Sequence, residues 1–494
     1  MKCYQRNINT LLSAALLCVS GINSARAEAN ETTINKTVAS INSFNCSADS
    51  SWFTHPSLPT EVKQSNGPGD SSFCDFYQFS WQSFAYLMAS SKTNPQVLNF
   101  QDSTQFNELE VNADGSPANS CDDKHDSHVL FIRTAKPQEN GTTFTIPERI
   151  GQAGGGATIY DQNNNVVYYD VQFSKNMCDV KKIQQQQNFP GGTTELKTAW
   201  KVLGANDDPS QFITMDANIT PDLKSTSTTK LGMIGFHLAV ATPNHPEFIW
   251  ATFEHKVNAP DCTSPETNTA WSFASKACTA DLKDQNALGI VQCRFNNPAP
   301  SQSLTGSASE ICREYAYGSA KGDLKYDENI QSIQTLNANV QPYLTDNFKV
   351  LSNYFNVGAL WVSNTSKGSE ISNQRGSLRL ANTVAETEYQ SVDLNADFVS
   401  NCFGCHNYTG TSNSGSNTTS NSLSHIFDDI AIGSNQCLDI QAANTINSQP
   451  QAETECPKTC TNSSSKLKWN GQWTNQSAST GEQLPQTVCG CCGA

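Results

Sequence analysis

Cysteine constrains the fold of this chain more than any other residue type. The 494 residues contain 18 cysteines. Cys3 and Cys18 lie in an N-terminal stretch that resembles an export signal, so sixteen remain in the mature chain. Cys402 and Cys405 are separated by two residues and directly precede His406. The other fourteen form an even set, which in an exported chain predicts disulfide bonds whose pairing the sequence does not fix.

The N-terminus has the parts of a secretory signal. Lys2 and Arg6 precede a short apolar run at 11–22, and residues 25–27 read Ala-Arg-Ala, a small-x-small cleavage site. The run is shorter than the roughly 20 apolar residues that span a bilayer. We therefore predict a signal peptide at 1–27 and a periplasmic or secreted mature chain that does not span a membrane.

Charge and aromatic content exclude other classes. Charged residues make up 16% of the chain, and 23 Phe, 13 Tyr and 8 Trp supply a large core. This composition is unlike that of a disordered protein. The formal net charge is -15, without any clustered Lys and Arg. Nucleic acid is therefore not an expected partner, because phosphate contacts need such clusters.

Patterning along the chain indicates an α+β fold in two parts. Aromatic residues from Phe73 onward predict a helix, and alternating apolar residues predict β-hairpins around 161–165 and 243–246. Residues 326–400 suggest mostly helix with breaks. A shift to cysteine-rich, aliphatic-poor sequence places a boundary near Ser434. We expect a large mixed body at 28–433, with a helical segment around Cys402 and Cys405, and a small disulfide-rich module at 434–494.

The C-x-x-C-H motif at 402–406 predicts covalent haem. Two thiols at this spacing can form thioethers with the two haem vinyl groups, and the adjacent histidine can ligate the iron. The alternative is a disulfide or redox-active pair. Export, the adjacent His406 and the even number of remaining cysteines favour one haem c on Cys402, Cys405 and His406.

The second axial iron ligand stays open at this stage. No methionine follows Met233, so a downstream Met ligand is excluded. His425 is the only downstream histidine and is the first candidate metal ligand with His406. The upstream rivals are Met233, His237 and His255, and the iron could also lack a sixth ligand.

Four segments of the body resemble uncharacterised exported bacterial monohaem c-type cytochrome proteins. They are 250–255 (WATFEH), 380–383 (LANT), 402–407 (CFGCHN) and 424–427 (SHIF). The resemblance implies a haem-bearing family without naming its reaction.

The C-terminal module resembles the MVL-type mannan-binding lectins. It carries C-P-x-x-C at 456–460, W-N-G-Q-W-T at 469–474 and C-G-C at 489–491, in the order found in that family. The resemblance implies a small unit that binds mannose-rich glycans or polysaccharides, with Asn447 where relatives often have Trp. It places these residues near the sugar: Trp469, Asn470, Gly471, Gln472, Trp473 and Thr474. The two tryptophans could equally be core.

Three functions are compatible with these features. The first is an exported electron-transfer or redox protein with an unknown redox partner and a glycan-binding tail. The second is a haem oxidoreductase of peroxidase type with an open iron site. The third is a glycan-binding protein in which haem is structural or sensory. The sequence leaves open whether the protein is an enzyme.

Overall fold

A computed structural model describes these residues of the chain: 45–109, 121, 131–132, 159–183, 189–219, 227–263, 269–283, 308–386, 393–395, 399, 401–411, 423–424, 426–427, 430, 437–463, 467–476 and 483–493. Contacts divide the chain into Met1–Asn45 and Cys46–Ala494. The predicted signal peptide at 1–27 lies outside the described residues.

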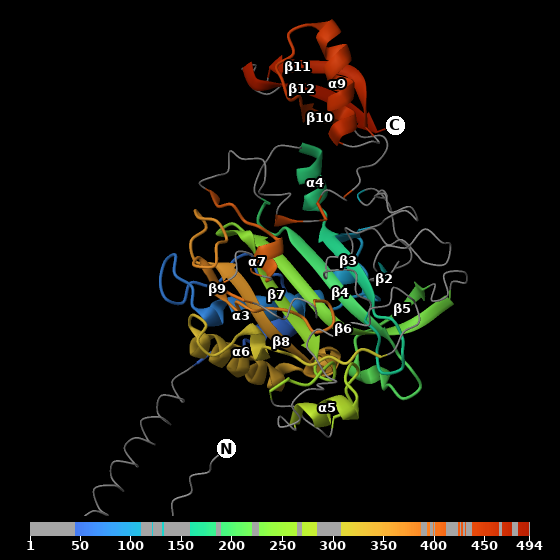
Figure 1. The fold of residues 1–494 in the computed structure, drawn as a ribbon, viewed down its shortest axis with the longest axis vertical. Coiled ribbons are helices and arrows are strands. Elements are labelled where there is room, and N and C mark those ends of the chain that lie inside the picture. The colour runs from blue at the N-terminus through green and yellow to red at the C-terminus, as the bar shows by residue number, and fades with distance from the viewer. Residues whose placement is uncertain are drawn as a thin grey trace, which may run out of the picture. The chain divides into compact units, whose positions relative to one another are not determined.

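A nine-stranded antiparallel sheet forms the centre of the body (Figure 1). Its main path runs β1-β3-β4-β6-β7-β8-β9, while β2 pairs with β3 and β5 with β6. The strands are β1 (Phe106–Glu108), β2 (Phe131–Ile132), β3 (Tyr168–Ser174), β4 (Thr194–Val202), β5 (Thr214–Ile219), β6 (Ser227–Thr242), β7 (His245–His255), β8 (Tyr354–Val362) and β9 (Gln374–Gly376). Together with the helices, this sheet confirms the predicted α+β class.

Both predicted hairpin turns are present. Thr242 pairs with His245, so β6 and β7 are joined through Pro243 and Asn244. At the other turn, Tyr160 bridges to Val166 shortly before β3 begins. The side chains of β3 are almost all buried, because both faces of the sheet are covered.

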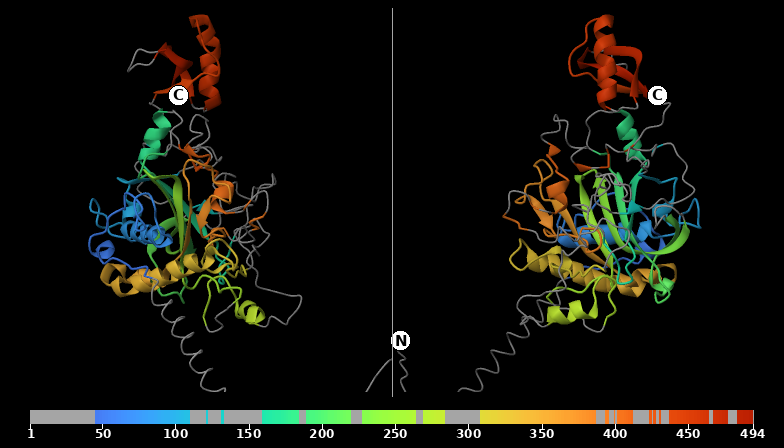
Figure 2. Two further views of the ribbon diagram at one scale, coloured as in Figure 1. Left: turned by 90° about the vertical axis from the view of Figure 1, so that its left-hand side faces the viewer. Right: turned by 45° about the vertical axis from the view of Figure 1, so that its right-hand side comes forward.

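Helix α3 (Phe73–Leu87) covers one face of the sheet (Figure 2). Ser72 begins it with a capping box, since its hydroxyl accepts from Asp75 N at 3.2 Å and its own N–H donates to the Asp75 carboxylate at 2.7 Å. The Phe84 ring then stacks on Phe253 of β7, with centroids 4.0 Å apart. Burial of several such rings supplies most of the stabilisation on this side.

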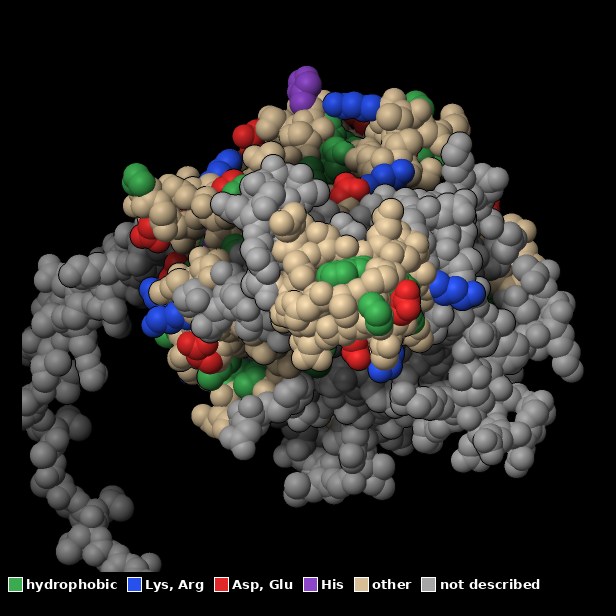
Figure 3. Space-filling model, turned by 90° about the horizontal axis from the view of Figure 1, so that it is seen from above, with side chains coloured by type: hydrophobic (Ala, Val, Ile, Leu, Met, Phe, Trp, Pro, Cys, Tyr) green, Lys and Arg blue, Asp and Glu red, His purple; other side chains and the backbone are tan. Residues whose placement is uncertain are grey.

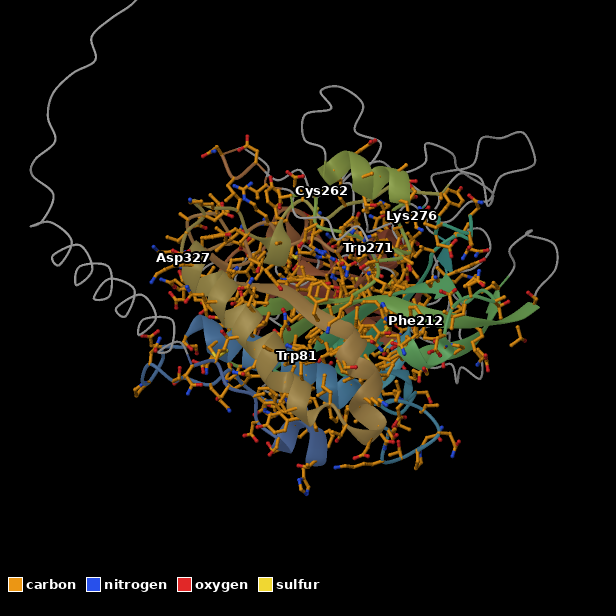
Figure 4. All side chains as sticks on the ribbon, turned by 90° about the horizontal axis from the view of Figure 1, so that it is seen from below. Trp81, Phe212, Cys262, Trp271, Lys276 and Asp327 are labelled. Carbon is orange, nitrogen blue, oxygen red and sulfur yellow. A yellow bond between two sulfur atoms is a disulfide. The ribbon has the colours of Figure 1, made fainter. Side chains whose placement is uncertain are left out.

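Helix α6 (Tyr326–Val340) packs against α3. The indole of Trp81 in α3 donates to Asn337 Oδ1 in α6 at 2.9 Å. Figure 4 shows this side, with Asp327 at the start of α6 and Trp81 beside the same helix. Shorter helices lie around the sheet: α2 (Ser51–Thr54), η1 (Asn99–Gln101), α4 (Asn176–Ile183), η2 (Pro209–Gln211), α5 (Lys276–Lys283), η3 (Ala316–Gly318), η4 (Gln341–Tyr343) and η5 (Asp346–Asn353).

The opposite face of the sheet carries α7 (Cys402–Cys405), which lies in front of β7 in Figure 1. A second buried cluster joins Phe403 and Tyr408 to Trp250 of β7 and Leu360 of β8. The segment around Cys402 and Cys405 is therefore packed on the sheet.

The expectation of mostly helix over 326–400 is wrong after residue 353. The stretch 354–362 forms β8, which is buried on both faces and pairs with β7 and β9. Apart from Asn356 this stretch is apolar or glycine, so it lacks the two-residue alternation that marks a half-buried strand. Its sequence period therefore does not distinguish a strand from a helix.

The C-terminal module has its own three-stranded sheet and one helix. The strands β10 (Cys437–Gln441), β12 (Gln483–Gly493) and β11 (Leu467–Gln476) lie in that order and are antiparallel. Helix α9 (Gln449–Ser463) packs on this sheet over a small core that includes Ile446, Ala452 and Leu467.

Disulfides occur in both parts of the described chain, as predicted. One of them joins Cys46 to Cys74. The other described disulfides are Cys121–Cys178, Cys262–Cys312, Cys456–Cys489 and Cys460–Cys491, and Cys278 is also disulfide-bonded. Such bonds are consistent with an exported protein. Within the described residues, no helix is both long and apolar enough to cross a membrane.

Candidate functional site

Helix α7 is fixed to the sheet by the residue that precedes it. The Asn401 side-chain oxygen accepts from Gly404 N at 3.2 Å and so caps the helix. Its amide nitrogen donates to Gln374 Oε1 at 2.7 Å and to Leu378 O at 2.9 Å. These bonds hold the motif against the segment that contains β9.

Cys402 and Cys405 are the two cysteines of the described part that carry thiols and form no disulfide. Burial raises the pKa of Cys402 well above its usual value, and burial followed by the nearby Glu386 carboxylate raises the pKa of Cys405. Reactive dithiols have lowered pKa values. The pair is therefore poorly suited to thiol–disulfide exchange at neutral pH.

His406 follows α7, and its ring orientation is set by the backbone. Its Nδ1 lies 2.8 Å from Leu423 O, so Nδ1 is the donor and Nε2 the acceptor nitrogen of the neutral ring. The ring also lies 4.3 Å from that of Trp250, centroid to centroid. Metal-binding histidines commonly donate one ring N–H to a carbonyl in this way, which orients the other nitrogen toward the metal.

His237 of β6 lines the same pocket as the motif and pairs with an acid there. Its Nε2 lies 2.9 Å from Glu386 Oε1, within ion-pair distance. Burial raises the pKa of Glu386, but His237 and then Lys197 outweigh this effect and lower it to about 2. The pocket therefore contains an ionised carboxylate beside an imidazole.

The Glu386 side chain is positioned through strand β7. Asn382 N donates to Glu386 Oε2 at 3.0 Å, and the Asn382 amide donates to Thr252 Oγ1 at 2.9 Å. Thr383 Oγ1 donates to Glu254 Oε2 at 2.7 Å. Two of the segments that carried the family resemblance, 250–255 and 380–383, are thus joined by hydrogen bonds beside the pocket.

Glu195 of β4 adds a second acid to the pocket wall. The residue is 8% exposed. Burial raises its pKa to about 8, and the neighbouring Ser424 hydroxyl offsets only part of this rise. Near neutral pH Glu195 is therefore mostly a neutral acid, in contrast to Glu386.

The pocket is lined by both apolar and polar side chains. Together with the open solvent at its mouth, it holds about 840 Å³ of space not filled by atoms. Ligand pockets are commonly lined mainly by apolar side chains. The apolar wall includes Val171, Leu196, Leu238, Ala239, Leu380 and Ile426.

The pocket wall also has unmet hydrogen-bonding capacity. Trp250 Nε1 and Glu195 Oε1 are buried and have no hydrogen-bond partner in the part of the chain that is described. Buried polar atoms are nearly always paired with protein, water or ligand. These atoms, the two thiols and the oriented His406 ring are polar groups with which a molecule bound in the pocket could pair.

Of the predicted iron ligands, the structure brings His406 and His237 to one pocket. His425 lies outside the described residues. Met233 is buried in the core under α3, and His255 lies at the far end of β7, with its Nε2 2.9 Å from Gln211 O. Burial lowers the pKa of His255 to about 4, so it is a neutral core histidine and does not line the pocket.

The predicted sugar-binding residues lie along β11 in two environments. Asn470, Gly471, Gln472 and Thr474 are exposed. Asn470 Oδ1 accepts from Gln472 N at 2.9 Å, which shapes the bend at Gly471, whose φ is +89°. These side chains offer a polar edge of the kind that binds hydroxyl groups.

The two tryptophans of β11 are half-buried against the module core. In the sheet register they lie opposite Cys491 and Cys489, which are bonded to α9. Trp469 Nε1 donates to Gln472 O and Trp473 Nε1 donates to Gln449 Oε1, each at 2.8 Å. Each indole N–H is thus held by another residue of the module.

Comparison with known families identifies the module. Residues 449–491 match the family MVL, described as mannan-binding protein. The match covers α9, β11 and most of β12, and it confirms the predicted resemblance there. Comparison with curated proteins and with solved structures gives no match.

Sequence patterns alone did not find the polar residues of the pocket wall. Glu195 and Lys197 lie two apart on β4, and Glu386 lies in a loop nearly two hundred residues later. Alternation along β4 places the first two on one face. The register that puts Lys197 opposite His237 is a tertiary property.

On the face in Figure 3, Lys and Arg lie singly among uncharged polar groups and form no basic patch within the described part of that face.

Proposed function

We propose that this protein is an exported monohaem c-type redox protein whose C-terminal module binds mannose-rich glycan. The observation that carries the proposal is the pocket that joins Cys402, Cys405 and His406 to His237. Both thiols are held on a capped helix, and the ring of His406 is oriented by Leu423 O.

In this proposal Cys402 and Cys405 would hold the haem covalently, through thioether bonds to its two vinyl groups. The raised pKa values of both thiols are compatible with cysteines that stay protonated before attachment. His406 Nε2 would be a ligand of the haem iron. When bound, haem supplies one-electron exchange with a redox partner. Trp250 and the apolar wall exclude water, and Lys197 provides a cation for acidic cofactor edges.

The His237–Glu386 pair favours a second candidate function, a haem oxidoreductase of peroxidase type. An imidazole held 2.9 Å from a carboxylate can act as a proton acceptor for a small molecule bound in the pocket. In the electron-transfer candidate, His237 or His425 would instead be a second ligand of the iron.

Carbon monoxide distinguishes the two candidates. Full-length protein made with haem-attachment machinery is reduced, and its visible spectrum is recorded with and without carbon monoxide. An electron carrier with two axial ligands gives a low-spin spectrum that carbon monoxide does not change, whereas an open site gives a shifted spectrum. If the wild-type spectrum is insensitive to carbon monoxide, His237→Ala and His425→Ala are compared in parallel. The variant whose spectrum becomes sensitive to carbon monoxide identifies the second iron ligand.

The glycan-binding part of the proposal is supported by the family match and the exposed edge of β11. We expect the double variant Asn470→Ala and Gln472→Ala to lose at least tenfold in affinity for mannan, measured by retention on immobilised mannan. Asn395→Ala, an exposed asparagine of the body, is the matched control. Equal retention of wild type and double variant would place the sugar site elsewhere.

A further inference from the structure

Glu195 is a buried acid in the pocket, and the described residues do not give it the partners that an ionised carboxylate needs. In the sheet register it lies opposite Phe173 of β3 and Ala239 of β6, neither of which carries charge. Its Oε1 has no hydrogen-bond partner and the side chain forms no ion pair within the described residues. Ser424 provides a neighbouring hydroxyl.

The titratable groups around Glu195 come from four elements. Its own strand contributes Lys197, β6 contributes His237, and the loop after Leu380 contributes Glu386. Helix α7 and its cap contribute Cys402, Cys405 and His406. Glu386 lies 2.9 Å from His237, whereas Glu195 forms no ion pair with any residue that the structure describes.

An acid in this position responds to any charge that enters the pocket. Burial already raises the pKa of Glu195 to about 8. The interaction between two charges grows as the local dielectric constant falls, so an added electron in the pocket favours the protonated form further. Loss of that electron has the opposite effect.

We propose that Glu195 is a proton-exchanging residue, which binds a proton when the redox group of this pocket gains an electron and releases it when the electron leaves. This inference rests on the proposed function. The balance is one electron from a one-electron donor and one proton from solvent taken up on reduction, with both returned on oxidation.

The inference predicts how the midpoint potential depends on pH. Between the pKa of Glu195 in the oxidised protein and its higher pKa in the reduced protein, reduction takes up a proton, so the potential falls as pH rises. Outside that interval Glu195 contributes no slope. Any slope that comes from His237 and Glu386 remains in a variant that lacks only the Glu195 acid.

The test is a redox titration of full-length holo protein over a pH range on both sides of about 8. Glu195→Gln keeps the shape of the neutral acid but removes its proton exchange, and we expect it to abolish most of the slope. Glu195→Asp should retain a slope. Glu247→Gln is the matched control, because Glu247 is a buried glutamate of β7 that does not line the pocket.

Redox-difference infrared spectroscopy gives an independent readout. Reduction should produce the carbonyl band of a protonated carboxyl in wild type and in Glu247→Gln, but not in Glu195→Gln. An unchanged slope together with an unchanged band in Glu195→Gln overturns the inference. A protein without haem absorbance overturns the proposed function instead, and this is visible before any potential is measured.

Discussion

At the scale of single residues, Asn401 connects the motif to the rest of the body. Its side chain accepts one hydrogen bond within α7 and donates two to the segment of Gln374 and Leu378. The residue is 4% exposed, so loss of these bonds leaves buried polar groups without partners. The position of both cysteines therefore depends on this one amide.

Asn401→Ala should destabilise the body and loosen α7. Loss of a helix cap and of buried hydrogen bonds costs about 1–3 kcal/mol, measured by urea unfolding. Asn395→Ala removes an exposed asparagine and should stay within about 0.5 kcal/mol of wild type. Equal stability of the two variants would contradict the hydrogen-bond arrangement described around Asn401.

Glu195 should also make stability depend on pH. Burial raises its pKa to about 8 in the folded protein, above the ordinary value of 4.5. The folded state therefore holds the proton more tightly than the unfolded state. Its contribution is complete below pH 4.5 and is lost as pH rises toward 8, on the order of a few kcal/mol.

Urea unfolding of wild type and Glu195→Gln at mildly acidic and mildly alkaline pH measures this contribution. As the pH rises, we expect the unfolding free energy of wild type to fall relative to that of Glu195→Gln. A difference that is constant over this range would mean that Glu195 is not buried as described.

The sequence could predict some residues of the pocket but not others. The motif at 402–406 was recognisable because its residues are adjacent in the chain. His237 was named only as one of several rivals, because its approach to Glu386 depends on the loop that follows Leu380. Glu195 gave no local signal, since one acid on a strand is not distinguishable from a solvated one before the register is known.

At the scale of elements, two disulfides hold the C-terminal module together. Cys456–Cys489 and Cys460–Cys491 both join α9 to β12. The module core is small, and both bonds lie inside it. Small domains depend on such bonds because they bury too little apolar surface.

Replacing both Cys456 and Cys489 by Ser should destabilise the module by about 2–5 kcal/mol. Because β11 is paired to β12, mannan retention should fall together with the stability of the module. The matched control replaces Cys46 and Cys74 by Ser, which removes a bond of the body and should leave mannan retention unchanged. Intact retention in the first variant would show that the polar edge does not need this bond.

Elements with a local signal were predictable, and those without one were not. The helix from Phe73 has a capping box and an aromatic face, and the hairpin of β6 and β7 has a Pro-Asn turn. Strand β8 was missed because both of its faces are buried. Its sequence therefore lacks the apolar–polar alternation by which a strand is recognised before the tertiary packing is known.

At the scale of the whole molecule, the chain combines a body with an oriented C-x-x-C-H pocket and a module with a known family. The module match covers residues 449–491. On the proposed function the module would offer one sugar site, and weak single sites bind strongly only to polyvalent surfaces or as oligomers. We therefore expect the module to bind polysaccharide more strongly than free sugar.

Thiol titration tests the cysteine assignment for the whole chain. Under denaturing, non-reducing conditions the mature holo protein should contain essentially no titratable thiol, because we expect the cysteines outside the motif to form disulfides and Cys402 and Cys405 to form thioethers. The same chain produced without haem-attachment machinery should show two thiols per molecule, from Cys402 and Cys405. More than two would contradict the disulfide assignment.

The central claim is covalent haem on Cys402 and Cys405, and its most direct test is haem retention after denaturation. The full-length protein is produced with haem-attachment machinery, unfolded and extracted with acidified organic solvent, and the haem absorbance of the polypeptide is measured. We predict that the absorbance stays with wild-type polypeptide and is lost when both cysteines are replaced by Ala. Haem that extracts completely from the wild-type protein, or is never bound, would contradict the account.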